Sequence, residues 1–194
     1  LYDVHIFPKN STQYGGVDLI KKGYTGNRCD EGLPNVTYEL YKYEGNAENP
    51  VYTKDSPDWK KITNKTTTAG DNTGDVLNLV TDSEGKISIE GLTKGTYCFV
   101  EQSAKVKQDG KEYESAYIVD KEPIYFTVDA TGNYTSTAKN DTINALEAKN
   151  HKPDVEKKVG MKDASGNISY DKKADYSIGD YVPYQVTITI PQNI

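Results

Sequence analysis

The sequence predicts an all-β protein built around an immunoglobulin-like β-sandwich. Short stretches that alternate apolar and polar residues recur along the chain, which is the pattern of half-buried strands. Turns rich in Gly, Asp and Asn separate them, and no segment carries an apolar stripe at helical spacing. The composition agrees, because 16 of the 194 residues are Tyr while Met and Trp occur once each, a balance that suits thin β-layers.

The strands of the sandwich can be placed by their alternation and by the turns between them. Turns are indicated at residues 82–85, 93–95, 108–110 and 130–133. The polar stretch 44–75 reads as a long surface excursion, with a short strand near Val51 and Tyr52. Strands are expected at residues 17–21, 35–42, 76–80, 86–90, 96–101, 117–119, 124–128 and 143–150.

The chain divides into three expected pieces. Residues 1–12 read as the last strand of a preceding domain, ended by Pro8, with a polar linker. Residues 13–152 hold the complete sandwich. Residues 153–194 contain strand-like stretches that are too few to close a sandwich, so we expect the first strands of a further, truncated β-domain.

Composition and motifs disfavour several classes of function. The net charge of −6 comes without a basic stripe, which argues against nucleic-acid binding, and no apolar run is long enough for membrane insertion. Two Cys and two His without ligand spacing predict neither a metal site nor a cofactor. Nucleotide-binding and nucleophile motifs are missing, and a glycosidase would need two facing carboxylates where one inward Glu is visible.

Three polar residues fall on inward-facing positions of apolar strands. Lys21 shares a face with Val17 and Leu19, Glu101 follows two aromatic residues on its own face, and Asn150 repeats the pattern in the last strand of the sandwich. Each could be a rim position whose polar end reaches water. Three such residues on three strands is a less ordinary arrangement than any one of them.

The two cysteines leave two possibilities open. Cys98 points to the opposite side of its strand from Glu101, and Cys29 lies in the loop after the first long strand. A surface disulfide and a pair of free thiols both fit this placement.

Residues 81–101, TDSEGKISIEGLTKGTYCFVE, resemble the E-box segment of the Cna protein B-type domains of Gram-positive surface proteins. Lys21 matches the first-strand lysine of that family, and residues 148–153 resemble its last-strand Asn followed by Pro. The resemblance covers residues 16–153. It implies a spontaneous isopeptide bond between Lys21 and Asn150, with Glu101 shuttling protons.

Residues 1–9, LYDVHIFPK, resemble the pilin motif of sortase-assembled pilus backbone subunits. Ile6 and Phe7 stand where Val and Tyr are commoner in that motif. The resemblance implies that Lys9 is joined to another subunit by a pilus-type sortase. The start of the third piece also resembles a pilin domain, in which Lys157 would be the donor of the next internal bond.

The resemblances together imply a structural function rather than an enzyme acting on a substrate. The expected protein is a subunit of a wall-anchored, extracellular pilus, with other pilin subunits as covalent head-to-tail partners and host ligands left open. The alternative is a stalk or binding domain of a non-polymerised, wall-anchored adhesin. That alternative shares the internal bond but needs no reactive Lys9.

Overall fold

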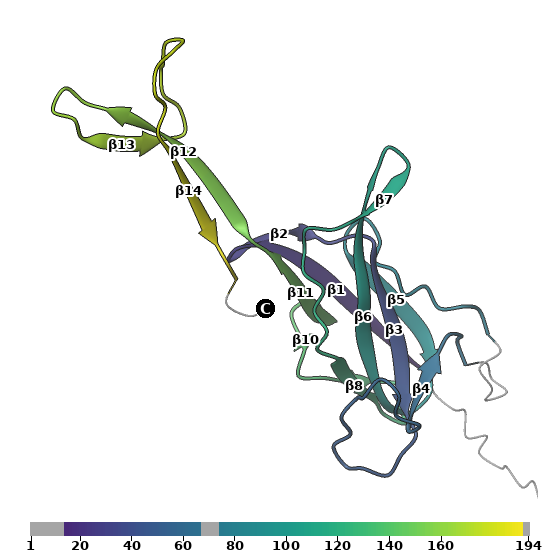
Figure 1. Ribbon diagram of the computed structural model, residues 1–194. Coiled ribbons are helices and arrows are strands. Elements are labelled where there is room, and N and C mark those ends of the chain that lie inside the picture. Colours follow the sequence, from purple (N-terminus) through teal and green to yellow (C-terminus); the bar gives the residue numbers. More distant parts are fainter. Residues whose placement is uncertain (1–13, 67–73, 192–194) are drawn as a thin grey trace, which may run out of the picture.

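The computed structural model describes residues 14–66 and 74–191. Two β-sheets pack against each other, and a third, smaller sheet extends from one end of this body (Figure 1). Among the described residues no helix is long and apolar enough to cross a membrane. Lys9 and the strand expected around it lie outside the described residues.

The first sheet is built around its long strand β1. On one side of β1 lies the parallel strand β11, and on the other side β5 pairs with the first half of β1 and β2 with its second half. The short strand β10 extends the sheet beyond β11. The bounds are β1 (Gly15–Thr25), β2 (Arg28–Gly32), β5 (Lys86–Leu92), β10 (Lys139–Asn140) and β11 (Ala145–Lys152).

The second sheet has the order β4-β3-β6-β8-β9, and β7 pairs with the far end of β6. The hairpin of β6 and β7 turns at Asp109 and Gly110, whose φ angles are 51° and 73°. Two consecutive positive φ angles match the twist of a two-residue hairpin. The hairpin extends beyond the body of the sandwich (Figure 1). The bounds are β3 (Val36–Tyr43), β4 (Trp59–Ile62), β6 (Gly95–Gln108), β7 (Lys111–Glu114), β8 (Ile124–Val128) and β9 (Tyr134–Thr135).

The hydrophobic core lies between these two sheets. Alternate residues of β1, β3, β5 and β6 point inward, as the period of two requires. Large aromatic side chains fill the middle, where Tyr97 and Phe99 both stack on Phe126. The other large contributors are Val17, Leu19, Leu33, Val36, Tyr38, Leu40, Ile62, Leu77, Ile87, Ile89, Leu92, Val128 and Leu146.

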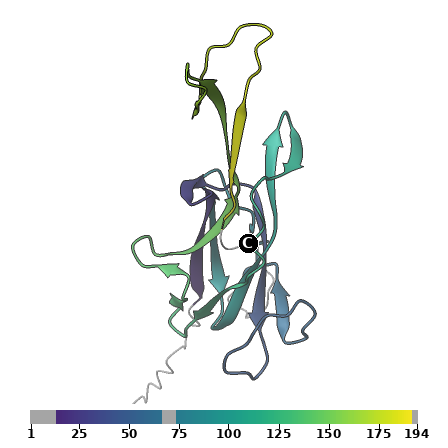
Figure 2. The ribbon, with the colours of Figure 1, turned by 60° about the vertical axis from the view of Figure 1, so that its left-hand side comes forward.

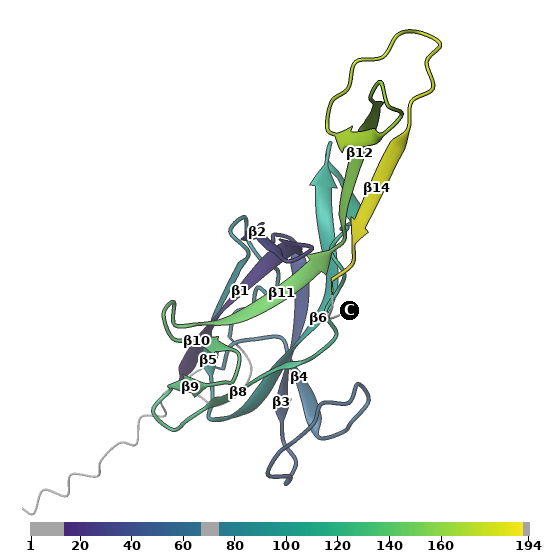
Figure 3. The same ribbon diagram turned by 90° about the vertical axis from the view of Figure 1, so that its left-hand side faces the viewer.

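The third sheet has the order β13-β12-β14, with bounds β12 (Asp154–Lys162), β13 (Ile168–Asp171) and β14 (Tyr184–Thr189). Only Pro153 separates β11 from β12, so one strand leads directly into the next (Figure 3). Figure 2 shows this sheet standing clear of the sandwich. One face of this sheet carries exposed apolar side chains, which are Val155, Tyr184, Val186 and Ile188.

The predicted fold class is confirmed, but not every predicted strand is present. Residues 76–80 make only isolated bridges, from Val76 to Asn64 and from Val80 to Thr37. Residues 117–119 form no strand, although the Ile118 N–H bonds the His151 carbonyl at 2.8 Å. The polar stretch 44–75 contains a strand at β4 and none near Val51 and Tyr52. Trp59 and Ile62 of β4 are buried, and this burial anchors the strand there.

The disulfide considered for Cys29 and Cys98 does not form, and both thiols are free. Cys29 lies exposed in β2, whereas Cys98 lies in β6 of the other sheet. Cys98 is paired laterally with Tyr41 and Tyr125, on the side of its sheet that faces away from the core. Burial raises the pKa of this thiol to about 12.

An aromatic cover explains why Cys98 is buried on the outer side of its sheet. The excursion between β3 and β4 folds back, and Tyr52 and Trp59 lie over Tyr41 and Tyr125, with ring centroids 4.8 Å apart for Tyr41–Tyr52 and 6.0 Å for Trp59–Tyr125. The Tyr52 N–H also donates to Tyr125 Oη at 2.7 Å. The long polar loop is therefore fixed on the sheet by its few aromatic residues.

We expect the two thiols to differ in reactivity. In the folded chain a small alkylating reagent should modify Cys29 and leave Cys98 intact, because Cys98 is buried and its thiol stays protonated. Mass spectrometry after native labelling should find one modified thiol, and two after unfolding. The Cys29→Ser variant should take up no label when native. Equal labelling rates at both sites would contradict the buried position of Cys98.

Candidate functional site

The three inward polar residues predicted from the sequence meet in the interior of the sandwich. Lys21 of β1, Glu101 of β6 and Asn150 of β11 are 1%, 5% and 1% exposed. Lys21 Nζ lies 2.6 Å from Glu101 Oε2, and Asn150 Nδ2 donates a hydrogen bond to Glu101 Oε1. One carboxylate thus bridges an amine and an amide.

The strand register accounts for this meeting. In the parallel pair of β1 and β11, Lys21 is opposite Ala148 and Gly23 is opposite Asn150. Lys21 and Asn150 are therefore offset by two residues on neighbouring strands, and both point into the core. Glu101 reaches them from the facing sheet.

Tyr38 of β3 completes the surroundings of the carboxylate. Its Oη donates to Glu101 Oε2 at 3.5 Å, and the centroid of its ring lies 5.8 Å from Lys21 Nζ. Lys21 Nζ also donates to the Lys149 carbonyl at 3.2 Å. Among the described residues no buried side-chain nitrogen or oxygen lacks a hydrogen-bond partner. The polar groups are satisfied in spite of their burial, as stability requires.

Burial also shifts the protonation of the site. Burial lowers the pKa of Lys21, and the charge of Glu101 partly opposes this shift. Burial raises the pKa of Glu101, and the charge of Lys21 and the hydrogen bonds from Lys21 and Asn150 partly oppose that shift. Both shifts favour a neutral amine beside a neutral carboxylic acid. Burial, followed by the charge of Glu101, raises the pKa of Tyr38 well above its ordinary value, so its hydroxyl remains a donor.

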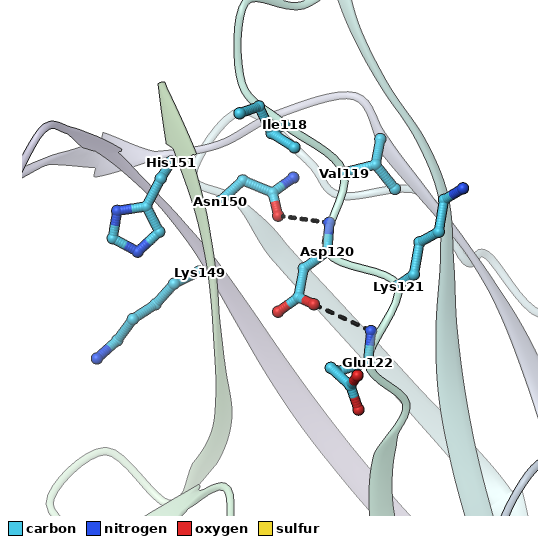
Figure 4. A pocket seen from close by; sticks show the side chains of 8 residues that line it. All are labelled: Ile118, Val119, Asp120, Lys121, Glu122, Lys149, Asn150 and His151. Atoms are coloured by element: carbon cyan, nitrogen blue, oxygen red, sulfur yellow. Dashed lines mark hydrogen bonds between the residues drawn. The ribbon is translucent and has the colours of Figure 1, made fainter. Parts of the chain in front are cut away.

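The Asn150 side chain borders a cavity of about 590 Å³. Residues 118–122 line one side of this cavity and residues 149–151 of β11 line the other. Asn150 points toward residues 118–122, while Lys149 and His151 point away from them (Figure 4). The Asp120 N–H donates to Asn150 Oδ1 at 3.3 Å. The amide is thus held from both ends, by Glu101 at its nitrogen and by Asp120 at its oxygen.

Neighbouring residues of the same chemical type are excluded by their positions. Lys22 lies on the other face of β1, where its Nζ pairs with Glu147 Oε2 at 2.9 Å. Asn144 precedes β11 as an exposed residue with a φ of 49°, in the turn rather than in the core. Lys21 and Asn150 are therefore the amine and the amide that the fold selects.

The other predicted site residues lie apart from this centre. Lys157 is exposed on β12, where its Nζ lies 4.0 Å from the centroid of the Tyr184 ring. Lys9 lies outside the described residues, as stated above. Across residues 14–66 and 74–191, no group of three or more His, Cys, Asp or Glu side chains could hold a metal ion.

Two members of the site were missed in the sequence. Tyr38 occupies an inward position between Val36 and Leu40, so the alternation could have placed its hydroxyl in the core. Asp120 contributes its backbone N–H rather than its side chain, and no residue pattern signals that. Glu101 lies at the amide nitrogen of Asn150, and the Asp120 N–H lies at its amide oxygen.

This arrangement has the parts of an acyl transfer onto an amine. It contains an amine whose burial favours the neutral form, a carboxyl group that contacts both this amine and the amide nitrogen, and a donor at the amide carbonyl oxygen. The site is closed to a macromolecular substrate, because the reacting side chains are buried. The three side chains can react with one another without movement of the surrounding strands, because they are already in contact.

Comparison with protein families places most of the chain in one of them. Residues 15–142 match the SpaA family, described as a prealbumin-like fold domain. A search among curated proteins found no significant match.

Solved structures with a similar fold include three from Gram-positive bacteria. A streptococcal ancillary pilin is 18% identical with a TM-score of 0.43, and the match covers 73% of this chain and 30% of that one. The pilus adhesin RrgA of Streptococcus pneumoniae is 20% identical with a TM-score of 0.43, covering 72% and 15%. BcpA, the major pilin subunit of Bacillus cereus, is 20% identical with a TM-score of 0.36, covering 76% and 31%. The chain thus spans less than a third of the length of each.

The buried pair makes a prediction about pH. In the Lys21→Ala variant, Glu101 loses the ammonium that lowers its pKa, so its folded pKa should rise further above the ordinary 4.5. Between 4.5 and that raised value the folded state binds more protons than the unfolded state. The free energy of unfolding should therefore fall as pH rises through this window, by up to about 1.4 kcal/mol per pH unit.

Urea unfolding between pH 4.5 and 8 measures this slope, with the Lys21→Ala, Glu101→Gln double variant as the control, since it has no carboxylate to titrate there. Identical slopes for the single and double variants would show that Glu101 is not desolvated in the way described.

Proposed function

The chain belongs to the SpaA family of prealbumin-like fold domains, and we propose that it is a structural subunit of a covalently polymerised cell-surface pilus. Its sandwich would form an internal isopeptide bond between Lys21 and Asn150. The observation that carries this proposal is the shared carboxylate: Glu101 contacts both the Lys21 amine and the Asn150 amide nitrogen inside the core.

The proposed reaction is a single self-modification without a cofactor. The neutral Nζ of Lys21 adds to Cγ of Asn150, and the proton that it loses passes to Glu101 Oε2. Glu101 begins as a neutral acid with its proton on Oε1, and it gives that proton to Nδ2 as Oε2 takes the proton from Nζ. The bond between Cγ and Nδ2 breaks, ammonia leaves, and Glu101 ends as a neutral acid. The products are one amide bond between Nζ and Cγ and one ammonia. The cavity beside Asn150 offers ammonia a way out.

Folding itself would supply most of the acceleration. The strands hold the amine, acid and amide in place, so no translational or rotational freedom is lost during the reaction. Once formed, the bond would close the loop between residues 21 and 150, and a cross-link over a loop of this size stabilises the folded state by about 5 kcal/mol in the chain-entropy model.

Lys9 would provide the link between subunits. The support is its place in a segment that resembles the pilin motif, directly after Pro8. A pilus-type sortase would join the Lys9 amine to the next subunit, head to tail, at the bacterial surface. Sortase and sister subunits are the partners in this proposal, and the location is extracellular.

We also propose that residues 13–152 form the sandwich domain and residues 153–194 the first strands of a further β-domain. The exposed apolar face of β12 and β14 supports this, because a sheet face of this kind is stabilised by packing against another layer. Lys157 sits on that face, between Val155 and Val159, and would become buried there as the amine of a second internal bond.

The alternative function, a stalk or binding domain of a non-polymerised adhesin, would use the same internal bond. No contact in the described structure favours it over the pilus. The two functions differ in Lys9 alone, which only the pilus requires.

The internal bond makes the first prediction of this proposal. The purified chain should be lighter than its sequence mass by one ammonia, and the Glu101→Ala and Lys21→Arg variants should have their full sequence masses. Intact-mass spectrometry under denaturing conditions measures the difference. Lys22→Arg is the matched control and should still lose ammonia, since Lys22 pairs with Glu147 outside the core. A parent chain at full mass would overturn the internal bond.

Intersubunit linkage gives the second prediction. A pilus-type sortase supplied with a peptide that carries its sorting signal should attach one peptide to the chain, and Lys9→Arg should abolish the product. Lys157→Arg is the control that keeps Lys9 and should be labelled like the parent. Equal labelling of the Lys9→Arg variant would remove Lys9 as the acceptor, and no labelling of any variant would favour the adhesin.

A further inference from the structure

Residues 115–122, which we call the cover segment, connect β7 to β8 and run beside the second half of β11, beyond the residues that pair with β10. The segment is attached to the sandwich at several points. The Ser115 N–H donates to the Ala104 carbonyl at 3.0 Å, the Ile118 N–H donates to the His151 carbonyl at 2.8 Å, and the Asp120 N–H donates to Asn150 Oδ1 at 3.3 Å. Only the last of these bonds reaches a side chain of the proposed reaction.

The orientation of the Asn150 amide follows from its two neighbours. Glu101 offers an acceptor oxygen, and the Asp120 N–H offers a donor. The reversed amide would place its NH₂ against the Asp120 N–H, so that two donors would face each other and this hydrogen bond would be lost. The Asp120 N–H is therefore directed at the carbonyl oxygen of the group that Lys21 attacks (Figure 4).

We propose that the backbone N–H of Asp120 is the oxyanion donor of the cross-linking reaction, so that the cover segment is part of the reacting site. This inference rests on the internal bond proposed above. The two groups would have different roles. Glu101 would transfer protons at Lys21 Nζ and Asn150 Nδ2, and the Asp120 N–H would stabilise the charge that develops on Oδ1.

A donor at this position would stabilise the charge that develops in the addition step. When Nζ adds to Cγ, the electron pair of the carbonyl double bond moves onto Oδ1, which becomes an oxyanion. It returns to restore the double bond when the bond to Nδ2 breaks. A hydrogen bond to a charged oxygen is shorter and stronger than one to a neutral carbonyl, so the 3.3 Å contact should tighten as the charge forms.

Tyr117 fixes the position of the cover segment relative to β1. Its ring lies against Gly23, where an added Cβ would come within 2.7 Å of ring carbons, and its Oη donates to Asp30 Oδ2 at 2.8 Å. Gly23 is the register partner of Asn150. The lack of a side chain at Gly23 thus lets the segment approach the strand next to the reacting amide.

The side chain of Asp120 has a separate role. It is exposed, and its Oδ1 accepts the Glu122 N–H at 3.0 Å. Its charge raises the pKa of Lys21 and of Glu101, which disfavours the neutral amine and favours the neutral acid, so the two effects oppose each other. Removing the carboxylate should therefore change the rate little, whereas removing the N–H should change it greatly.

The test compares the rates at which variants lose ammonia. Each chain is made by cell-free synthesis, sampled over time, alkylated under native conditions and then weighed in denaturant. One spectrum reports the cross-link, through the lost ammonia, and the fold, through the protected Cys98 thiol. Asp120→Pro deletes the N–H, Asp120→Asn keeps it, and Lys121→Pro places the same ring one residue further along.

We expect folded Asp120→Pro to react about 100-fold more slowly than the parent, the usual loss on removal of one oxyanion donor. Asp120→Asn and Lys121→Pro should stay within about threefold of the parent, because both keep the Asp120 N–H. If the parent loses ammonia and folded Asp120→Pro is as fast as Lys121→Pro, the oxyanion assignment is wrong. If the parent itself keeps its full mass, the internal bond is wrong instead.

Should Asp120→Pro leave Cys98 unprotected, the variant has not folded and Tyr117→Phe decides the matter. This variant keeps the ring against Gly23 and loses the hydroxyl, and with it the hydrogen bond to Asp30 that holds the segment. A rate several-fold below that of the parent supports the assignment, since the donor is then less well positioned. An unchanged rate overturns it.

Discussion

The structure depends on one costly feature, a lysine and a glutamate buried together in an apolar core. Removing two such groups from water is unfavourable unless every donor and acceptor finds a partner. Strands from both sheets supply these partners, with Tyr38 from β3, the Lys149 carbonyl from β11 and the Asn150 amide completing the set. The register of β1 against β11 is therefore set by polar contacts as well as by apolar packing.

The sequence predicts this centre because β-strands alternate strictly. Lys21, Glu101 and Asn150 each continue an inward apolar series, so a period of two placed all three on inward faces and left open whether they lie in the core or at its rim. It could not show that they meet, because contact depends on how strands far apart in the chain are paired. The family resemblance supplied that step, and the structure brings the three residues together.

Other features are invisible to strand periodicity. The strand β2 has no alternation and is formed by pairing with the second half of β1, where the turn at Gly26 returns the chain. Residues 76–80 alternate between apolar and polar residues, but they do not pair along one strand. Val76 forms a bridge with Asn64, and Val80 forms a bridge with Thr37. The Asp120 N–H has no signature, because every residue except proline carries the same group and only tertiary structure directs it at Asn150.

The parallel pairing of β1 with β11 has a mechanical consequence. Tension applied at the start of β1 and at the end of β11, where Pro153 leads into β12, pulls these neighbouring strands in opposite directions along their length. The hydrogen bonds between them are then loaded together in shear rather than broken one at a time. A covalent bond from Lys21 to Asn150 would lie on this same path, so tension would pass from one strand to the other while the residues between them stayed unloaded.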